Sequence, residues 1–182
     1  MNKIVSLSRI LKLSALGLCA ALPLLEAGYW ISSGYPFLEP WFQAAPLPIF
    51  SKWPVGWGDL TGAQKCLGFL SNLITLAFTM GSLVYLSKLF ASMQQLRLFE
   101  KENALFVRKA GWALLWGQML HPLSVACLSL SLTYRNPVGH RAVEVAIGTH
   151  ELAMIALGLT LLLLSWILEE ASVMNEEREA TV

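Results

Sequence analysis

Three polar side chains, Glu26, Gln118 and His121, stand inside otherwise apolar stretches and are the first candidates for chemistry. Each raises a functional hypothesis, because polar and ionisable groups are costly in a membrane interior. On helices that rise about 1.5 Å per residue, Glu26 and His121 would differ in depth by only several ångström, within reach of a direct or water-bridged pair. Gln118 would lie about one turn before His121. Three interpretations stay open: a pair that fixes helix register, a proton relay or small-ligand site, and no contact at all.

Signatures of catalysis are missing from the sequence. There is no GxSxG, P-loop or HExxH pattern, so we expect no enzymatic activity and no catalytic residue. Cys19, Cys66 and Cys127 fall inside apolar runs, where a thiol behaves as a small hydrophobe, and we interpret them as packing residues. No CxxC motif or Cys/His cluster indicates a metal site.

The histidines do not suit a haem. His121 falls in the middle of one apolar stretch and His150 at the outer start of the next, so their expected depths differ by well over about 10 Å. His140 lies in the loop between these stretches. Two axial ligands of one haem must share a depth, and we therefore expect no cofactor.

The C-terminal tail, residues 169–182, concentrates negative charge after an apolar run. Its structural interpretation is ion pairing with the preceding basic loop, residues 91–109, at about 0 to 1 kcal/mol for each exposed pair. Its functional interpretation is a docking site for a basic cytoplasmic protein, because complementary charge favours fast encounter. A DNA-binding regulator has such a basic face. The glutamates are Glu169, Glu170, Glu176, Glu177 and Glu179.

The composition indicates the class of protein in which these polar side chains lie. Of 182 residues, 55% are hydrophobic and 14% charged, and the mean hydropathy of +0.57 is typical of an integral membrane protein. Four apolar stretches are long enough to span a bilayer, and the period-two alternation of a membrane barrel is absent. The net charge of +1 gives no reason to expect direct nucleic acid binding. We predict an all-α, single membrane domain over residues 1–182, a bundle of four transmembrane helices at about 10–31, 66–90, 104–134 and 150–175.

The first stretch could instead be a signal peptide, because "MNKIVSLSRILK" is a basic start followed by an apolar core. The residue before Cys19 is Leu18, where a lipoprotein cleavage site needs a small residue. The apolar run also continues past Pro23 to "GYWI", whose aromatic residues suit a membrane interface. We therefore expect a retained helix.

Basic residues predict the orientation of the bundle, because Lys and Arg accumulate in cytoplasmic flanks. Acids contribute little to this rule, so the acidic tail does not oppose it. Both termini are therefore expected in the cytoplasm. Nine of the 13 basic residues fall on that side, namely Lys3, Arg9, Lys12, Lys88, Arg97, Lys101, Arg108, Lys109 and Arg178, and Lys52, Lys65, Arg135 and Arg141 fall on the other.

The long outer loop, residues 32–65, combines prolines with Trp41, Trp53 and Trp57. Prolines exclude a continuous helix, and tryptophan favours the headgroup zone. We expect this loop to lie across the outer membrane surface, either as an interfacial anchor or as an extracytoplasmic sensing surface.

Three stretches resemble a widespread bacterial family of small four-span membrane proteins, catalogued as the domain of unknown function DUF2975. "LTGAQKCLGFLSNL" resembles the family's threonine-glutamine start to the second helix. "LFEKENALFVRKAG" resembles its pattern of phenylalanine, asparagine and glycine, here Phe99, Asn103 and Gly111, with Glu100 where the family often has Ser or Thr. The acidic end closing on Thr181 and Val182 resembles the family's C-terminus. The resemblance covers nearly the whole chain.

The resemblance implies a multi-pass membrane protein of bacteria, which we expect in the inner membrane. Genes of this family often lie beside one for a Cro/cI-type helix-turn-helix regulator, so it also implies binding or modulation of such a cytoplasmic partner. The alternative is a small transporter, proton pathway, or lipid- or small-molecule-binding bundle around Glu26, Gln118 and His121. Small-residue spacings such as Gly17-x-x-x-Ala21 permit close helix approach and leave a homo-oligomer open.

Overall fold

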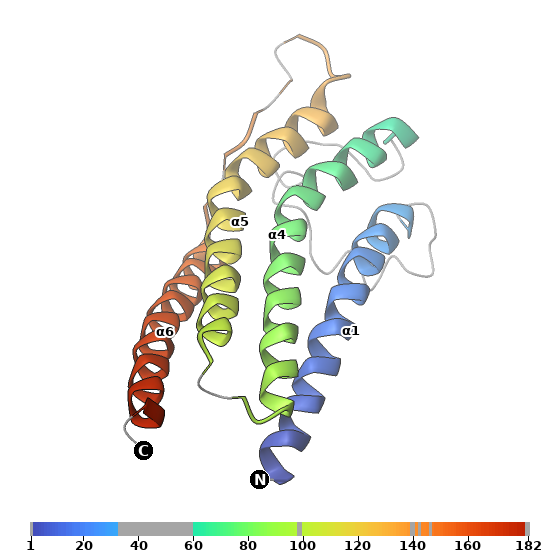
Figure 1. Ribbon diagram of the computed structural model, residues 1–182. Helices are drawn as coiled ribbons and strands as arrows, with labels where there is room; N and C mark the ends of the chain where they lie inside the picture. The colour runs from blue at the N-terminus through green and yellow to red at the C-terminus, as the bar shows by residue number, and fades with distance from the viewer. Residues whose placement is uncertain are drawn as a thin grey trace. The chain divides into compact units, whose positions relative to one another are not determined.

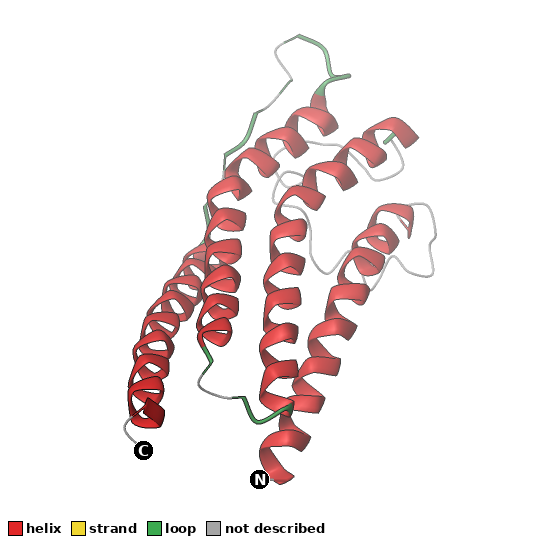
Figure 2. Ribbon diagram, viewed as in Figure 1, coloured by secondary structure: helices red, strands yellow, loops and turns green. Residues whose placement is uncertain are grey.

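The computed structural model describes residues 2–32, 60–97, 100–138, 141, 143–145 and 147–180. This part of the chain forms four helices, α1 (Asn2–Ser32), α4 (Gly62–Gln94), α5 (Lys101–Thr133) and α6 (Thr149–Ala180) (Figure 1). It contains no strand (Figure 2). The predicted all-α fold is confirmed.

All four helices are long and apolar enough to cross a membrane. They contain 31 to 33 residues, or about 47 to 50 Å at 1.5 Å per residue, whereas the hydrocarbon core is about 30 Å thick. The first helix begins at Asn2 instead of near residue 10, and the last continues to Ala180 instead of residue 175. The length of an apolar stretch predicts only the segment of a helix that lies in lipid. The helical backbone hydrogen bonds continue past that segment, so each helix is longer than its apolar stretch.

Large apolar side chains on these helices point outward. Leu13, Leu24 and Leu25 on α1 each leave 60% or more of their surface exposed. Soluble monomers rarely expose apolar patches on this scale, whereas lipid chains cover them without cost. The exposed leucines therefore agree with a membrane-spanning role.

Contacts divide the chain into two compact units, which are described separately. Unit 1 comprises Met1–Ala20, Ala77–Met119 and Gly148–Val182, and unit 2 comprises Ala21–Leu76 and Leu120–Ile147. In unit 1, small and branched residues that are at most 1% exposed line one face of α5: Ala104, Val107 and Ala110. In unit 2, a core of Trp30, Leu60, Leu128 and Leu132 packs against Tyr29 and Phe69.

Hydroxyl side chains inside the helices are bonded to carbonyls one turn earlier. Ser71 Oγ donates to Leu67 O at 2.8 Å, and Ser165 Oγ donates to Leu162 O at 2.7 Å. Such bonds satisfy a hydroxyl that lipid could not solvate. The same pattern occurs at Ser87, Ser129, Ser131, Thr133, Thr160 and Ser172.

Candidate functional site

The turn between α4 and α5 in unit 1 ends α4 with a Schellman motif. Arg97 N–H donates to Ser92 O at 3.3 Å, and Leu96 N–H donates to Met93 O at 3.1 Å. Leu96 has a φ of 60°, the left-handed conformation this motif requires and usually gives to glycine. The chain therefore reverses direction here through main-chain bonds.

Asn103 fastens the start of α5 to this turn. Its side chain is 1% exposed, and its Nδ2 donates to Arg97 O at 2.5 Å. The Ser92 hydroxyl donates to the same carbonyl at 3.2 Å. Asn103 therefore has a structural role in the motif that the sequence singled out, whereas Phe99 lies outside the described residues.

Gly111, the third residue of that motif, marks the close approach of α5 and α6. A β-carbon on Gly111 would lie 2.9 Å from Gly158 O and 3.2 Å from Leu161 Cβ. Only glycine allows two helix backbones to come so near. The sequence did not single out Gly158.

Two ion pairs join the acidic tail to the start of α5. Lys101 Nζ lies 2.7 Å from Glu176 Oε2, and an Arg108 guanidinium nitrogen lies 2.8 Å from Glu169 Oε2. The partners are seven residues apart on each helix, or about two turns, so the pairs form along one antiparallel seam. Ion pairing between the basic loop and the tail is thus observed for Glu169 and Glu176.

The tail has a second face that is exposed. Glu170, Val173, Met174 and Glu177 follow the spacing of one helix face and are all exposed, with Met174 at 56%. We call these four residues the outer tail face. The side chain of Glu179 and the residues Thr181 and Val182 lie outside the described part of the chain.

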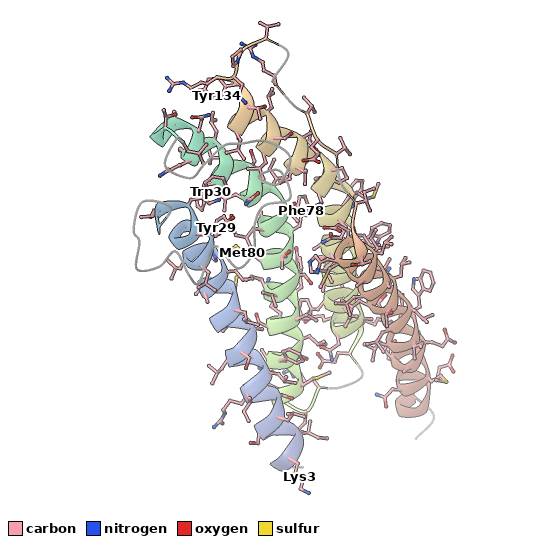
Figure 3. The ribbon with its side chains drawn as sticks, turned by 180° about the vertical axis from the view of Figure 1, so that it is seen from behind. Lys3, Tyr29, Trp30, Phe78, Met80 and Tyr134 are labelled. Atoms are coloured by element: carbon pink, nitrogen blue, oxygen red, sulfur yellow. The ribbon has the colours of Figure 1, made fainter. Side chains whose placement is uncertain are left out.

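Glu26 in unit 2 is held by two partners that the sequence did not indicate. Its Oε1 accepts hydrogen bonds from Trp30 Nε1 at 2.9 Å and from Asn72 Nδ2 at 2.6 Å. Trp30 projects with Tyr29 near the end of α1 (Figure 3), and its ring would lie only 2.1 Å from a β-carbon on Gly68. Gly68 therefore makes room for the indole that binds Glu26.

The other two polar candidates lie on α5. His121 is half-buried beside Pro122 in unit 2, and Gln118, 7% exposed, belongs to unit 1. Glu26 has Trp30 and Asn72 as hydrogen-bond partners. The pairing of Glu26 with His121 stays a prediction.

The start of α4 is fixed by Gln64, within the threonine-glutamine stretch. Its Oε1 accepts from the Thr61 N–H at 3.1 Å and from the Thr61 hydroxyl at 2.9 Å, a capping arrangement. Its Nε2 donates to Leu132 O near the end of α5 at 2.9 Å. One side chain therefore caps α4 and ties it to α5 within unit 2.

The cysteines are free, and only Cys19 is half-buried; Cys66 and Cys127 are exposed. The interpretation of the latter two as packing residues is wrong, because an apolar run does not reveal which side of a helix meets a neighbour. Among the described residues, no group of three or more His, Cys, Asp or Glu side chains could hold a metal ion. The aromatic outer loop and His140 lie outside the described residues, apart from the ends of that loop.

The four apolar helices define a multi-pass helical membrane protein. A family model described as "Protein of unknown function (DUF2975)" matches residues 37–182, which include α4, α5 and α6. The chain belongs to this family. The match begins after α1, so Glu26 and Trp30 lie outside it. Searches of curated proteins and of solved structures found no match.

Proposed function

We propose that this chain is a non-enzymatic protein of the bacterial inner membrane that docks a basic cytoplasmic protein on the outer tail face. One observation carries the proposal: Glu169 and Glu176 pair with α5 on one side of α6, and Glu170 and Glu177 are exposed on another side of the same helix. The tail is helical as far as Ala180, so a partner would meet a preformed surface and little ordering entropy would be lost on binding.

Contacts within unit 1 support the prediction that both termini lie on the same side of the membrane. Gln94 Nε2 donates to Ser8 O at 3.3 Å, which brings the start of α1 to the end of α4. The Lys101–Glu176 pair brings the end of α6 to the start of α5 (Figure 1). The nine basic residues assigned to the cytoplasmic side all belong to unit 1. This distribution favours a cytoplasmic location for the turn and the tail.

The chemistry of the outer tail face suits a DNA-binding partner. Glu170 and Glu177 present negative charge, and Val173 and Met174 between them offer apolar contact. A helix-turn-helix regulator, the partner that the family resemblance implies, carries a basic surface for DNA. Binding to the glutamates would compete with DNA and would weaken as salt rises.

A pull-down from detergent-solubilised native membranes tests the proposal. The charge reversal Glu170→Lys with Glu177→Lys should abolish recovery of a small basic DNA-binding protein that elutes at moderate salt. The matched control, Glu169→Gln with Glu176→Gln, removes the ion pairs and keeps the outer tail face. The control should retain the partner, and a chain ending at Leu168 should lose it. Equal recovery by all four proteins would overturn the proposal.

The alternative is a small transporter, proton pathway or ligand-binding bundle around Glu26, Gln118 and His121. The presence of Glu26 in an apolar span favours it. The hydrogen bonds from Trp30 and Asn72 support a structural role for the same carboxylate instead. If Glu26→Gln and His121→Ala leave transport and ligand binding unchanged, the alternative is excluded.

A further inference from the structure

A cavity of about 390 Å³ opens between α4 and α5 within unit 1. Its volume falls in the range of small-molecule sites, roughly 300 to 1,000 Å³. One wall is apolar and contains Ala77, Phe78 and Gly81 from α4 and Ala113 from α5; Figure 3 labels Phe78. Neither Glu26 nor any residue of the outer tail face is among the residues that line the cavity.

The cavity changes character along the helix axes. From Ala77 to Tyr85 on α4 it extends about 12 Å, at 1.5 Å per residue. On α5, which runs the opposite way in sequence, Arg108 and Lys109 lie toward the same end as Tyr85, and Ala113 lies toward the apolar end. The site is therefore amphipathic, with cations at one end and an apolar wall at the other.

Three cations gather at the polar end. Lys88 Nζ and Lys109 Nζ each lie 5.7 Å from the centre of the Tyr85 ring. Arg108 binds Glu169 through its terminal nitrogen, whereas its buried Nε–H has no acceptor among the described residues. Glu169 is the one carboxylate paired here, so the charge around the opening is positive within the part of the chain that the structure describes.

We propose that this cavity binds one anionic phospholipid. The headgroup phosphate accepts hydrogen bonds from Arg108 and Lys109, with Lys88 adding charge, and an acyl chain lies along Ala77, Gly81 and Ala113. Basic pockets between transmembrane helices recognise anionic headgroups in this manner. A phosphate ion alone would leave the apolar wall unused, and a zwitterionic lipid would leave the positive charge unbalanced. Trp112, which also lines the cavity, is an aromatic residue suited to the headgroup zone.

The test measures retained lipid by native mass spectrometry of the full chain. The protein is purified in detergent and titrated with phosphatidylglycerol or with phosphatidylcholine as the zwitterionic probe. Phosphatidylglycerol should bind at least about tenfold more tightly than phosphatidylcholine, because basic residues near the headgroup attract its net negative charge. Equal binding of the two lipids would overturn the proposal. Inorganic phosphate should not displace the bound lipid, and its displacement at comparable concentration would reduce the site to an anion site.

Two pairs of variants locate the site. Lys88→Gln with Lys109→Gln should weaken phosphatidylglycerol binding about tenfold, whereas Lys3→Gln with Lys12→Gln changes the net charge equally outside the cavity and should not. Gly81→Leu should fill the apolar wall and abolish binding. Gly17→Leu is its matched control, because a β-carbon at either glycine meets nothing within 4 Å and both variants should fold. Binding unaffected by Gly81→Leu would contradict an acyl chain in the cavity.

Discussion

Gly158 presents its backbone oxygen 2.9 Å from the point that a β-carbon on Gly111 would occupy, so α5 and α6 touch through their main chains. Gly111→Ala is therefore expected to destabilise the protein by about 1 to 3 kcal/mol, because the obstacle is backbone and cannot rotate away. Thermal unfolding in detergent measures the effect. Gly17→Ala is the control, since its β-carbon meets nothing within 4 Å, and helix propensity should make it neutral or stabilising. Equal melting temperatures for the two variants would contradict a backbone contact.

The left-handed conformation of Leu96 predicts a stabilising substitution. A non-glycine residue in this conformation costs about 1 to 2 kcal/mol, and Leu96→Gly removes most of that cost while keeping the Schellman hydrogen bonds. We expect a higher melting temperature for Leu96→Gly than for Leu96→Ala, which loses the same side chain and keeps the unfavourable φ. The opposite order would show that the turn does not require this backbone conformation.

Substitutions of Glu26 test whether unit 2 needs the hydrogen-bond acceptor or the charge of this side chain. Glu26→Gln keeps an oxygen that can accept from Trp30 and Asn72, so its stability should stay within about 1 kcal/mol of the native value. Glu26→Ala leaves both donors without an acceptor and should lose about 1 to 3 kcal/mol. Unfolding curves of the two variants measure the difference. Equal loss of stability in both variants would mean that the charge of Glu26, and not its hydrogen bonds, stabilises unit 2.

The Lys101–Glu176 pair predicts mutual rescue. Lys101→Glu places two carboxylates together and should lower the free energy of unfolding by up to about 1 kcal/mol, because both side chains are largely exposed. Adding Glu176→Lys should restore most of that loss. High salt should diminish both effects through screening. A double variant no more stable than Lys101→Glu would mean that the contact contributes nothing in solution.

Different parts of the structure could be predicted from the sequence to different extents, for physical reasons. Apolar length alone predicted four helices, since lipid imposes that length on any span. Charge predicted ion pairing between loop and tail, yet only the helix register selects Lys101 and Arg108. Asn72 could not be predicted as a partner of Glu26 because it is 46 residues away and periodicity does not say which faces of two helices meet. Trp30 is four residues from Glu26 and could have been recognised from its helical spacing. The Thr61–Gln64 cap is local and could have been recognised from its spacing.

The hydroxyls that donate to carbonyls one turn earlier change how the hydropathy of these helices should be judged. The most apolar 18-residue stretch of α5 has a mean hydropathy of 1.3, the lowest of the four spans, against 2.1 for α6. Three of its hydroxyls, on Ser129, Ser131 and Thr133, donate to carbonyls of α5 itself. All three side chains are also buried, so none of them presents a free hydroxyl to lipid, and hydropathy scales calibrated on free hydroxyls underestimate how well this span suits a membrane. Serine and threonine therefore serve here as small packing residues, and a helix can contain many of them within a bilayer while its lipid-facing surface stays apolar.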